Sequence, residues 1–194
     1  MGRKIKKYKI IYADPPWPET SESMIPVKER RKQGALLDAR NHFPVMNETN
    51  IIGIGDKLSL IISDNCALFL WTTSRHIPMA LRVMEHWGFR FVNVGFTWMK
   101  KNKNLGTPFI GLGYYTKHNA EFCLLGVKGT IKPVKFNIPS AVYEEKREAF
   151  RKPDTVRYRI EQLFGNVPRL ELFARQKIKG WDAWGNEIKN DIEI

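Results

Sequence analysis

The sequence predicts an α/β protein built on a mostly parallel β-sheet that helices cover on both faces. Short apolar runs alternate along the chain with segments of helical spacing, which is the order of parallel strands joined by crossover helices. Hydrophobic residues make up 43% of the chain, enough for a packed core, so wholesale disorder is excluded. The length of 194 residues fits a single domain, which we expect to span residues 1–194.

The first half of the chain predicts two strands and two helices around one long loop. An apolar run directly before Asp14 and two prolines predicts a buried strand that ends there. The polar, aperiodic stretch that follows predicts a loop, and a loop of this length inside a domain is usually functional. In order, we expect a strand over Tyr8–Ala13, a basic loop over 18–46, a helix over 47–62, a strand over 66–71 and a helix over 77–87.

The second half predicts three further strands and one helix. Pro153 suits the start of a helix and Gly165 its end, so a helix is expected between them. A glycine-rich stretch that begins with lysines predicts a second basic loop. In order, we expect a strand over 91–99, a basic loop over 100–117, a strand over 121–127, a helix over 153–164 and a strand over 170–174.

Composition narrows the class of function. Lys and Arg number 32 against 20 Asp and Glu, and this net charge of +12 favours polyanions, with solubility alone as the alternative. No apolar run reaches the roughly 18 residues of a membrane span, and the basic N-terminus lacks the apolar core of a signal peptide. Cys66 and Cys123 lie in apolar runs and form no disulfide framework, which predicts a reducing, cytoplasmic setting. The four histidines lack ligand spacing, so no metal is expected.

The motif Asp14-Pro15-Pro16-Trp17 follows the first strand, where sites of parallel sheets are found. Two prolines stiffen the turn and leave its carbonyls free to accept, and Asp14 adds an acceptor-only carboxylate. Trp17 offers a broad ring face beside these acceptors. The combination suits a flat ring with an exocyclic amine, such as an adenine taken out of a strand. The alternative is an ordinary proline-rich turn with a capping aspartate and a packed tryptophan.

This motif resembles the DPPW signature of amino-methyltransferases that use S-adenosylmethionine. Over residues 8–187 the chain resembles the N6-adenine methyltransferase family, typified by the catalytic subunit of the mRNA adenosine methyltransferase, which has many short bacterial and phage members. A lone DPPW motif is moderate evidence, whereas further blocks in the family's order make the resemblance specific. These blocks are residues 68–72, 87–89, 97–100, 118–121, 125–129, 151–154, 170–175 and 184–187.

The resemblance implies a Rossmann-like methyltransferase fold with permuted motif order, in which the catalytic strand comes first, the cofactor strand last, and one late strand is antiparallel. It implies methyl transfer from S-adenosylmethionine to the N6 amine of adenine. Short stand-alone members are mostly associated with DNA, so DNA is favoured over RNA. An RNA adenosine methyltransferase and a non-catalytic nucleic-acid-binding partner subunit stay open, although the intact motif argues against the latter. A bacterial or phage origin and a homodimer or partner subunit are further expectations from the family.

The same resemblance assigns roles to individual residues. Asp14 and the Pro15 carbonyl would accept the N–H bonds of the amine, and Trp17, or Pro16 with Trp17, would stack on the base. Glu187 departs from the family, which commonly has an amide there, so it can accept from ribose hydroxyls but not donate. The residues expected to bind the cofactor are Asp14, Lys152, Glu171, Phe173, Arg175, Asn186 and Glu187.

Several of these assignments have alternatives. Lys152, expected to meet the carboxylate of the cofactor, could instead be a solvated lysine near a helix start. Glu171 and Arg175 could form a buried ion pair with each other. The adenine ring of the cofactor is expected against Phe173, or else against Ile178 or Trp181.

Basic residues in the two loops are expected to bind the phosphates of the nucleic acid, because both loops flank the predicted site in sequence. A solvated charged face is the alternative for any one cluster. The residues concerned are Lys28, Arg30, Arg31, Lys32, Lys100, Lys101 and Lys103.

Overall fold

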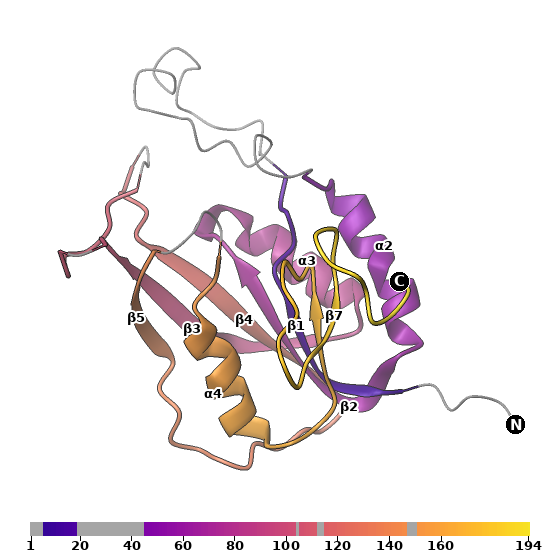
Figure 1. Ribbon diagram of the computed structural model, residues 1–194. Coiled ribbons are helices and arrows are strands. Elements are labelled where there is room, and N and C mark those ends of the chain that lie inside the picture. The colour runs from indigo at the N-terminus through magenta and orange to yellow at the C-terminus, as the bar shows by residue number, and fades with distance from the viewer. Residues whose placement is uncertain (1–5, 19–44, 104, 112–114, 147–150) are drawn as a thin grey trace, which may run out of the picture.

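One seven-stranded sheet organises the protein, as the computed structural model shows (Figure 1). The structure describes residues 6–18, 45–103, 105–111, 115–146 and 151–194. The strand order across the sheet is β5-β3-β4-β2-β1-β6-β7. The strands are β1 (Tyr8–Ala13), β2 (Ile62–Thr72), β3 (Arg90–Lys101), β4 (Ala120–Lys128), β5 (Ala141–Glu145), β6 (Arg169–Leu172) and β7 (Asp182–Trp184).

Strand direction confirms the expected sheet type. The pairs β1–β2, β1–β6, β6–β7 and β3–β5 are parallel. Strand β4 pairs antiparallel with both of its neighbours, β2 and β3. The described sheet is therefore mostly parallel with one reversed strand, in agreement with a Rossmann-like methyltransferase fold.

Helices cover both faces of the sheet (Figure 1). Alternate residues of β1 point to opposite faces, so Ile11 joins the core under α2 and α3, and Tyr12 joins the core under α4. The indole N–H of Trp87 donates to the Ile51 carbonyl at 3.0 Å and ties α3 to α2. The helical segments are α2 (Glu48–Ser59), the 3-10 turn η2 (Ser74–His76), α3 (Ile77–His86) and α4 (Asp154–Phe164).

Several predicted boundaries were wrong, and two strands were missed. The first helix ends three residues early, because the chain turns at Leu60 to enter β2. Strand β3 runs to Lys101, so Lys100 and Lys101 belong to a strand and not to the loop predicted over 100–117. The last predicted strand, 170–174, stops at Leu172 because Phe173 takes a positive φ of 60°. Strands β5 and β7, of five and three residues, are too short to show a period in sequence.

Candidate active site

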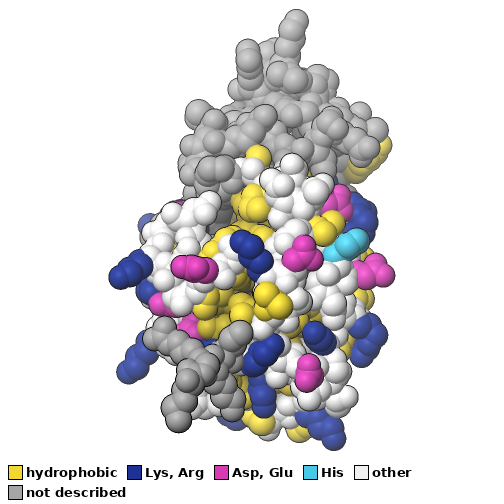
Figure 2. All heavy atoms as spheres, turned by 90° about the vertical axis from the view of Figure 1, so that its right-hand side faces the viewer, with side chains coloured by type: hydrophobic (Ala, Val, Ile, Leu, Met, Phe, Trp, Pro, Cys, Tyr) yellow, Lys and Arg dark blue, Asp and Glu magenta, His cyan; other side chains and the backbone are white. Residues whose placement is uncertain are grey.

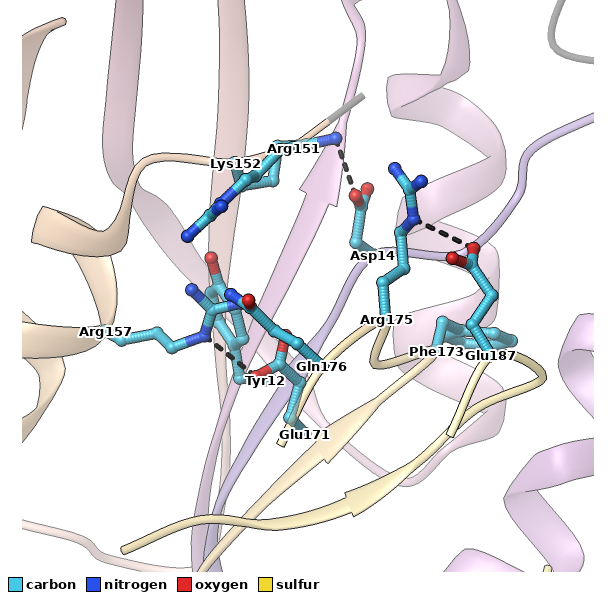
Figure 3. Close-up of a pocket in the computed structure, with 10 residues that line it drawn as sticks. All are labelled: Tyr12, Asp14, Arg151, Lys152, Arg157, Glu171, Phe173, Arg175, Gln176 and Glu187. Carbon is cyan, nitrogen blue, oxygen red and sulfur yellow. Dashed lines mark hydrogen bonds and ion pairs between the residues drawn. The ribbon is translucent and has the colours of Figure 1, made fainter. Parts of the chain in front are cut away.

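A pocket opens at the carboxyl ends of the parallel strands β1 and β6 (Figure 3). The position agrees with the rule that sites of open α/β sheets lie beyond the carboxyl ends of the strands. The chain just before α4 and the segment after β7 complete the walls. The lining residues are Tyr12, Asp14, Arg151, Lys152, Arg157, Glu171, Phe173, Arg175, Gln176 and Glu187.

Asp14 lies in this wall within a chain of alternating charges. Lys152 Nζ lies 2.6 Å from Asp14 Oδ2 and 3.2 Å from Glu121 Oε2. The ammonium of Lys100 pairs with the other carboxylate oxygen of Glu121. The Lys152 side chain is only 11% exposed, so the alternative of a solvated lysine is wrong. The four charges, two of each sign, neutralise one another, and Asp14 and Lys152 are the two that line the pocket.

The charged groups in this row of ion pairs shift one another's pKa values. Burial raises the pKa of the Asp14 carboxyl above its usual range, while the ammonium of Lys152 acts in the opposite direction. Burial would lower the pKa of Lys152, but Asp14 and Glu121 hold it above its usual range. Burial would likewise raise the pKa of Glu121, but Lys152 and Lys100 hold it below its usual range. Glu121 and Lys152 are therefore charged at neutral pH.

The prolines of the motif form a tighter turn than the sequence predicted. The Pro15 carbonyl accepts the backbone N–H of Trp17 at 2.9 Å, and the Pro16 carbonyl accepts that of Met46 at 3.0 Å. The expectation that these carbonyls are free was wrong, although a carbonyl keeps a second lone pair for another donor. The Trp17 indole donates to the Trp71 carbonyl at 2.9 Å and packs against the apolar core.

Glu171, on β6, is paired with Arg157, which was not among the predicted site residues. Arg157 donates through Nε to Glu171 Oε2 at 2.8 Å and through Nη2 to Oε1 at 2.6 Å. Both side chains are about nine-tenths buried, and the guanidinium also lies 5.2 Å from the ring centroid of Tyr12. The alternative of a Glu171–Arg175 pair was wrong, because Arg157 takes both carboxylate oxygens.

Arg175 and Glu187 face each other across the exposed side of the pocket (Figure 3). Arg175 Nε donates to Glu187 Oε1 at 2.9 Å, and the two side chains are 43% and 47% exposed. The strand ends that carry them approach closely, since a Cβ on Gly185 would lie 2.1 Å from the Ala174 carbonyl oxygen. Asn186 is exposed and does not line the pocket.

The aromatic side chains divide between the pocket and the core. Phe173 lines the pocket and meets Trp184 edge to face at 5.5 Å. Ile178 and the buried Trp181 pack into the core under α4, so the alternative that they hold the adenine of the cofactor was wrong. The positive φ of Phe173 is unusual for a residue with a side chain, and such strain clusters at functional sites.

The structure brings six of the seven predicted cofactor residues to one pocket, which Asn186 does not line. Four lining residues were missed. Two of them are sequence neighbours of predicted residues and a third lies two residues before Asp14, and this closeness in sequence is the signal that could have found them. Arg157 lies one helical turn inside α4 and carries no such signal. The four are Tyr12, Arg151, Arg157 and Gln176.

The predicted phosphate contacts are only partly described. Lys100 is engaged with Glu121, Lys101 lies 5.8 Å from the Tyr143 ring centroid, and Lys103 is exposed after β3. On the face in Figure 2, lysine and arginine side chains are scattered rather than gathered into one patch. Four predicted residues lie outside the described part of the chain: Lys28, Arg30, Arg31 and Lys32.

Two features are absent from the described residues. No group of three His, Cys, Asp or Glu side chains there is placed to bind a metal ion. None of the described helices has the length and apolar character to cross a membrane.

Comparison with known proteins confirms the resemblance found in the sequence. Residues 8–187 match the MT-A70 family. A type II methyltransferase of a Mycoplasma species, M.MunI, is 31% identical, with 97% of this chain and 82% of that protein covered. The human N(6)-adenosine-methyltransferase catalytic subunit METTL3 is 29% identical over 94% of this chain, and a putative MT-A70-like protein of Medicago truncatula is 28% identical over the same share. The chain spans only 28% and 26% of these two proteins.

Proposed function

This chain belongs to the MT-A70 family, and from that premise we propose that it transfers a methyl group from S-adenosylmethionine to the N6 amine of adenine in DNA. The observation that carries the proposal is the place of Asp14. It directly follows the first strand, lines the pocket beyond the carboxyl end of that strand, and belongs to an intact Asp14–Trp17 motif. The same pocket contains groups of both charges and an aromatic ring.

The pocket residues fit the chemistry of the cofactor. Lys152 and Arg151 are cations suited to its carboxylate, and Asp14 is an acceptor suited to its ammonium group. Glu187 and Arg175 offer an acceptor and a donor for ribose hydroxyls. When bound, S-adenosylmethionine supplies an electrophilic methyl group on a sulfonium. The charged pocket walls orient that methyl group and need no reorganisation during the reaction.

Asp14 and the stiff turn after it would act on the target base. The lone pair of the adenine amine is delocalised into the ring, so the amine is a poor nucleophile. Acceptors for its N–H bonds favour a pyramidal nitrogen whose lone pair is directed at the methyl group. Asp14 still has acceptor capacity, because an ionised carboxylate offers about four lone-pair sites and Lys152 bonds to only one oxygen. The Pro15 carbonyl is the second acceptor, and Trp17 is the stacking surface.

The choice of polymer rests on the bacterial relative. Similarity to a type II methyltransferase over most of both chains supports DNA. RNA adenosine is the second candidate, supported by the similarity to METTL3, of which this chain spans about a quarter. The net charge of +12 supports a nucleic acid of either kind. A non-catalytic partner subunit is disfavoured by the intact motif.

Mass spectrometry of digested nucleic acid tests the proposal. Single- and double-stranded DNA and RNA are incubated with the protein and S-adenosylmethionine that carries a deuterated methyl group. We expect labelled N6-methyladenine in DNA. The label in RNA alone would favour the second candidate, and no label in any polymer would overturn the enzymatic proposal.

Substitution of Asp14 separates catalysis from binding. Asp14→Ala is expected to abolish transfer while largely sparing cofactor binding measured by calorimetry. Asp56→Ala is the matched control, because Asp56 is exposed on α2 away from the pocket. Retained turnover in Asp14→Ala would refute the role of Asp14.

A further inference from the structure

The end of the Asp14–Trp17 turn contacts His76, a residue far away in sequence. His76 ends the short turn η2, which follows β2. Its ring contacts both Trp17 and the Pro18 carbonyl, although 58 residues separate His76 from Pro18. The resemblance and the pocket assign nothing to His76, so these contacts need their own explanation.

The hydrogen bonds define the form of the imidazole. Its Nε2 atom lies 2.8 Å from the Pro18 carbonyl oxygen, which can only accept, so Nε2 carries the proton. Its Nδ1 atom lies 2.9 Å from the Thr73 hydroxyl oxygen, which can donate to it. Both ring nitrogens are thus satisfied by the neutral tautomer. Burial lowers the pKa of His76 below its usual range; the hydrogen bond to Pro18 acts in the opposite direction, and the neighbouring charge of Arg75 in the same direction as burial.

The ring itself supports the indole of Trp17. The two rings are stacked, with centroids 6.0 Å apart and planes inclined by 14°. The indole N–H of Trp17 is also held by the Trp71 carbonyl, at the end of β2. The plane of Trp17 is therefore defined by a hydrogen bond at one edge and by a parallel ring beside it. Both supports come from β2 and the turn that follows it.

We infer that neutral His76 is a positioning residue that sets the plane of Trp17 and the path of the catalytic turn for a purine stacked there. The inference rests on the proposed function and extends it to a residue outside the pocket. His76 acts through Trp17 and Pro18 and does not touch the cofactor site. Its loss should therefore impair transfer to the base without weakening cofactor binding, because small displacements of a reacting group are costly.

Three substitutions separate the ring stacking of His76 from its hydrogen bonds. His76→Phe keeps a ring and loses both hydrogen bonds, and His76→Gln keeps a donor for the Pro18 carbonyl and loses the ring. His76→Ala loses the ring and the hydrogen bonds together. His86→Ala is the matched control, since His86 is an exposed histidine on α3 that bonds only within its own helix. Steady-state methylation of a DNA oligonucleotide gives kcat and KM, calorimetry gives the Kd for S-adenosylmethionine, and thermal unfolding reports stability.

We expect His76→Ala to lower kcat about tenfold to a hundredfold. The losses of kcat in His76→Phe and His76→Gln should each be smaller than the loss in His76→Ala. The cofactor Kd should change less than about twofold, and His86→Ala should match the wild type. The inference would be overturned, and the proposed function left standing, if kcat and KM were unchanged in His76→Ala. If His76→Ala does not fold, unchanged kcat and KM in His76→Phe and His76→Gln would have the same meaning. A parallel loss of cofactor affinity would overturn it in favour of a general structural role. An inactive wild type would overturn the proposed function itself, and the inference with it.

Discussion

Replacing Glu171 by glutamine is expected to destabilise the protein because it leaves the charge of Arg157 buried without its main partner. The two side chains share two hydrogen bonds and are about nine-tenths buried. Removing one partner of a buried ion pair typically costs ~3–5 kcal/mol. Asp154 stays bonded to Arg157 Nη1 at 2.7 Å and is 39% exposed, so it offsets part of this cost. We therefore expect the lower end of the range, about 3 kcal/mol.

A thermal unfolding scan measures this change. At roughly 2–4 °C per kcal/mol for a chain of this size, Glu171→Gln should lower Tm by about 6–12 °C. The matched control is Glu187→Gln, the same substitution in the Arg175–Glu187 pair of the same pocket. That pair is nearly half exposed, and such pairs contribute below about 1 kcal/mol, so Tm should fall by less than about 4 °C.

The difference in Tm between the two variants tests whether burial gives the Arg157–Glu171 pair its larger contribution. Equal shifts in Tm would show that burial of the Arg157–Glu171 pair has no special energetic weight. Unchanged stability with a large loss of cofactor affinity would return Glu171 to the direct cofactor contact that the sequence analysis expected. Replacing both Arg157 and Glu171 by methionine should recover much of the lost stability, since well-packed apolar pairs are often as stable as buried ion pairs.

Three further predictions concern other parts of the site. Gly185→Ala should cost about 1–3 kcal/mol by chemical unfolding, because its Cβ would meet the Ala174 backbone, whereas Gly53→Ala, with nothing within 4 Å on helix α2, should be neutral or stabilising. Lys152→Met should move the acid limb of kcat to higher pH, because Lys152 lowers the pKa of Asp14 and the proposed mechanism uses the Asp14 carboxylate; an unmoved limb would contradict their coupling. Binding to a DNA oligonucleotide should weaken steeply with salt in fluorescence anisotropy, and a flat dependence would exclude phosphate contacts.

Local sequence patterns were enough to predict the class of the fold and to place the Asp14–Trp17 turn at the end of the first strand. Apolar runs and helical spacing are local signals, and among the described residues they identified five of the seven strands and all three α-helices. Asp14-Pro15-Pro16-Trp17 could be placed at a strand end because two prolines cannot continue a central strand. Strands β5 and β7 could not be predicted from local signals, because segments of three to five residues form a strand only when a neighbouring strand pairs with them.

Which side chains contact one another depends on long-range packing, which local sequence patterns do not reveal. Lys152 reaches Asp14 across 138 residues of sequence, and Arg157 rather than Arg175 takes Glu171. Residue types predicted charged partners but could not choose between two arginines, because the choice depends on which helix face turns toward β6. The support of Trp17 by His76 is of the same kind. Composition and motif determine which chemistry a chain can perform, whereas long-range packing determines which atoms are close enough to perform it.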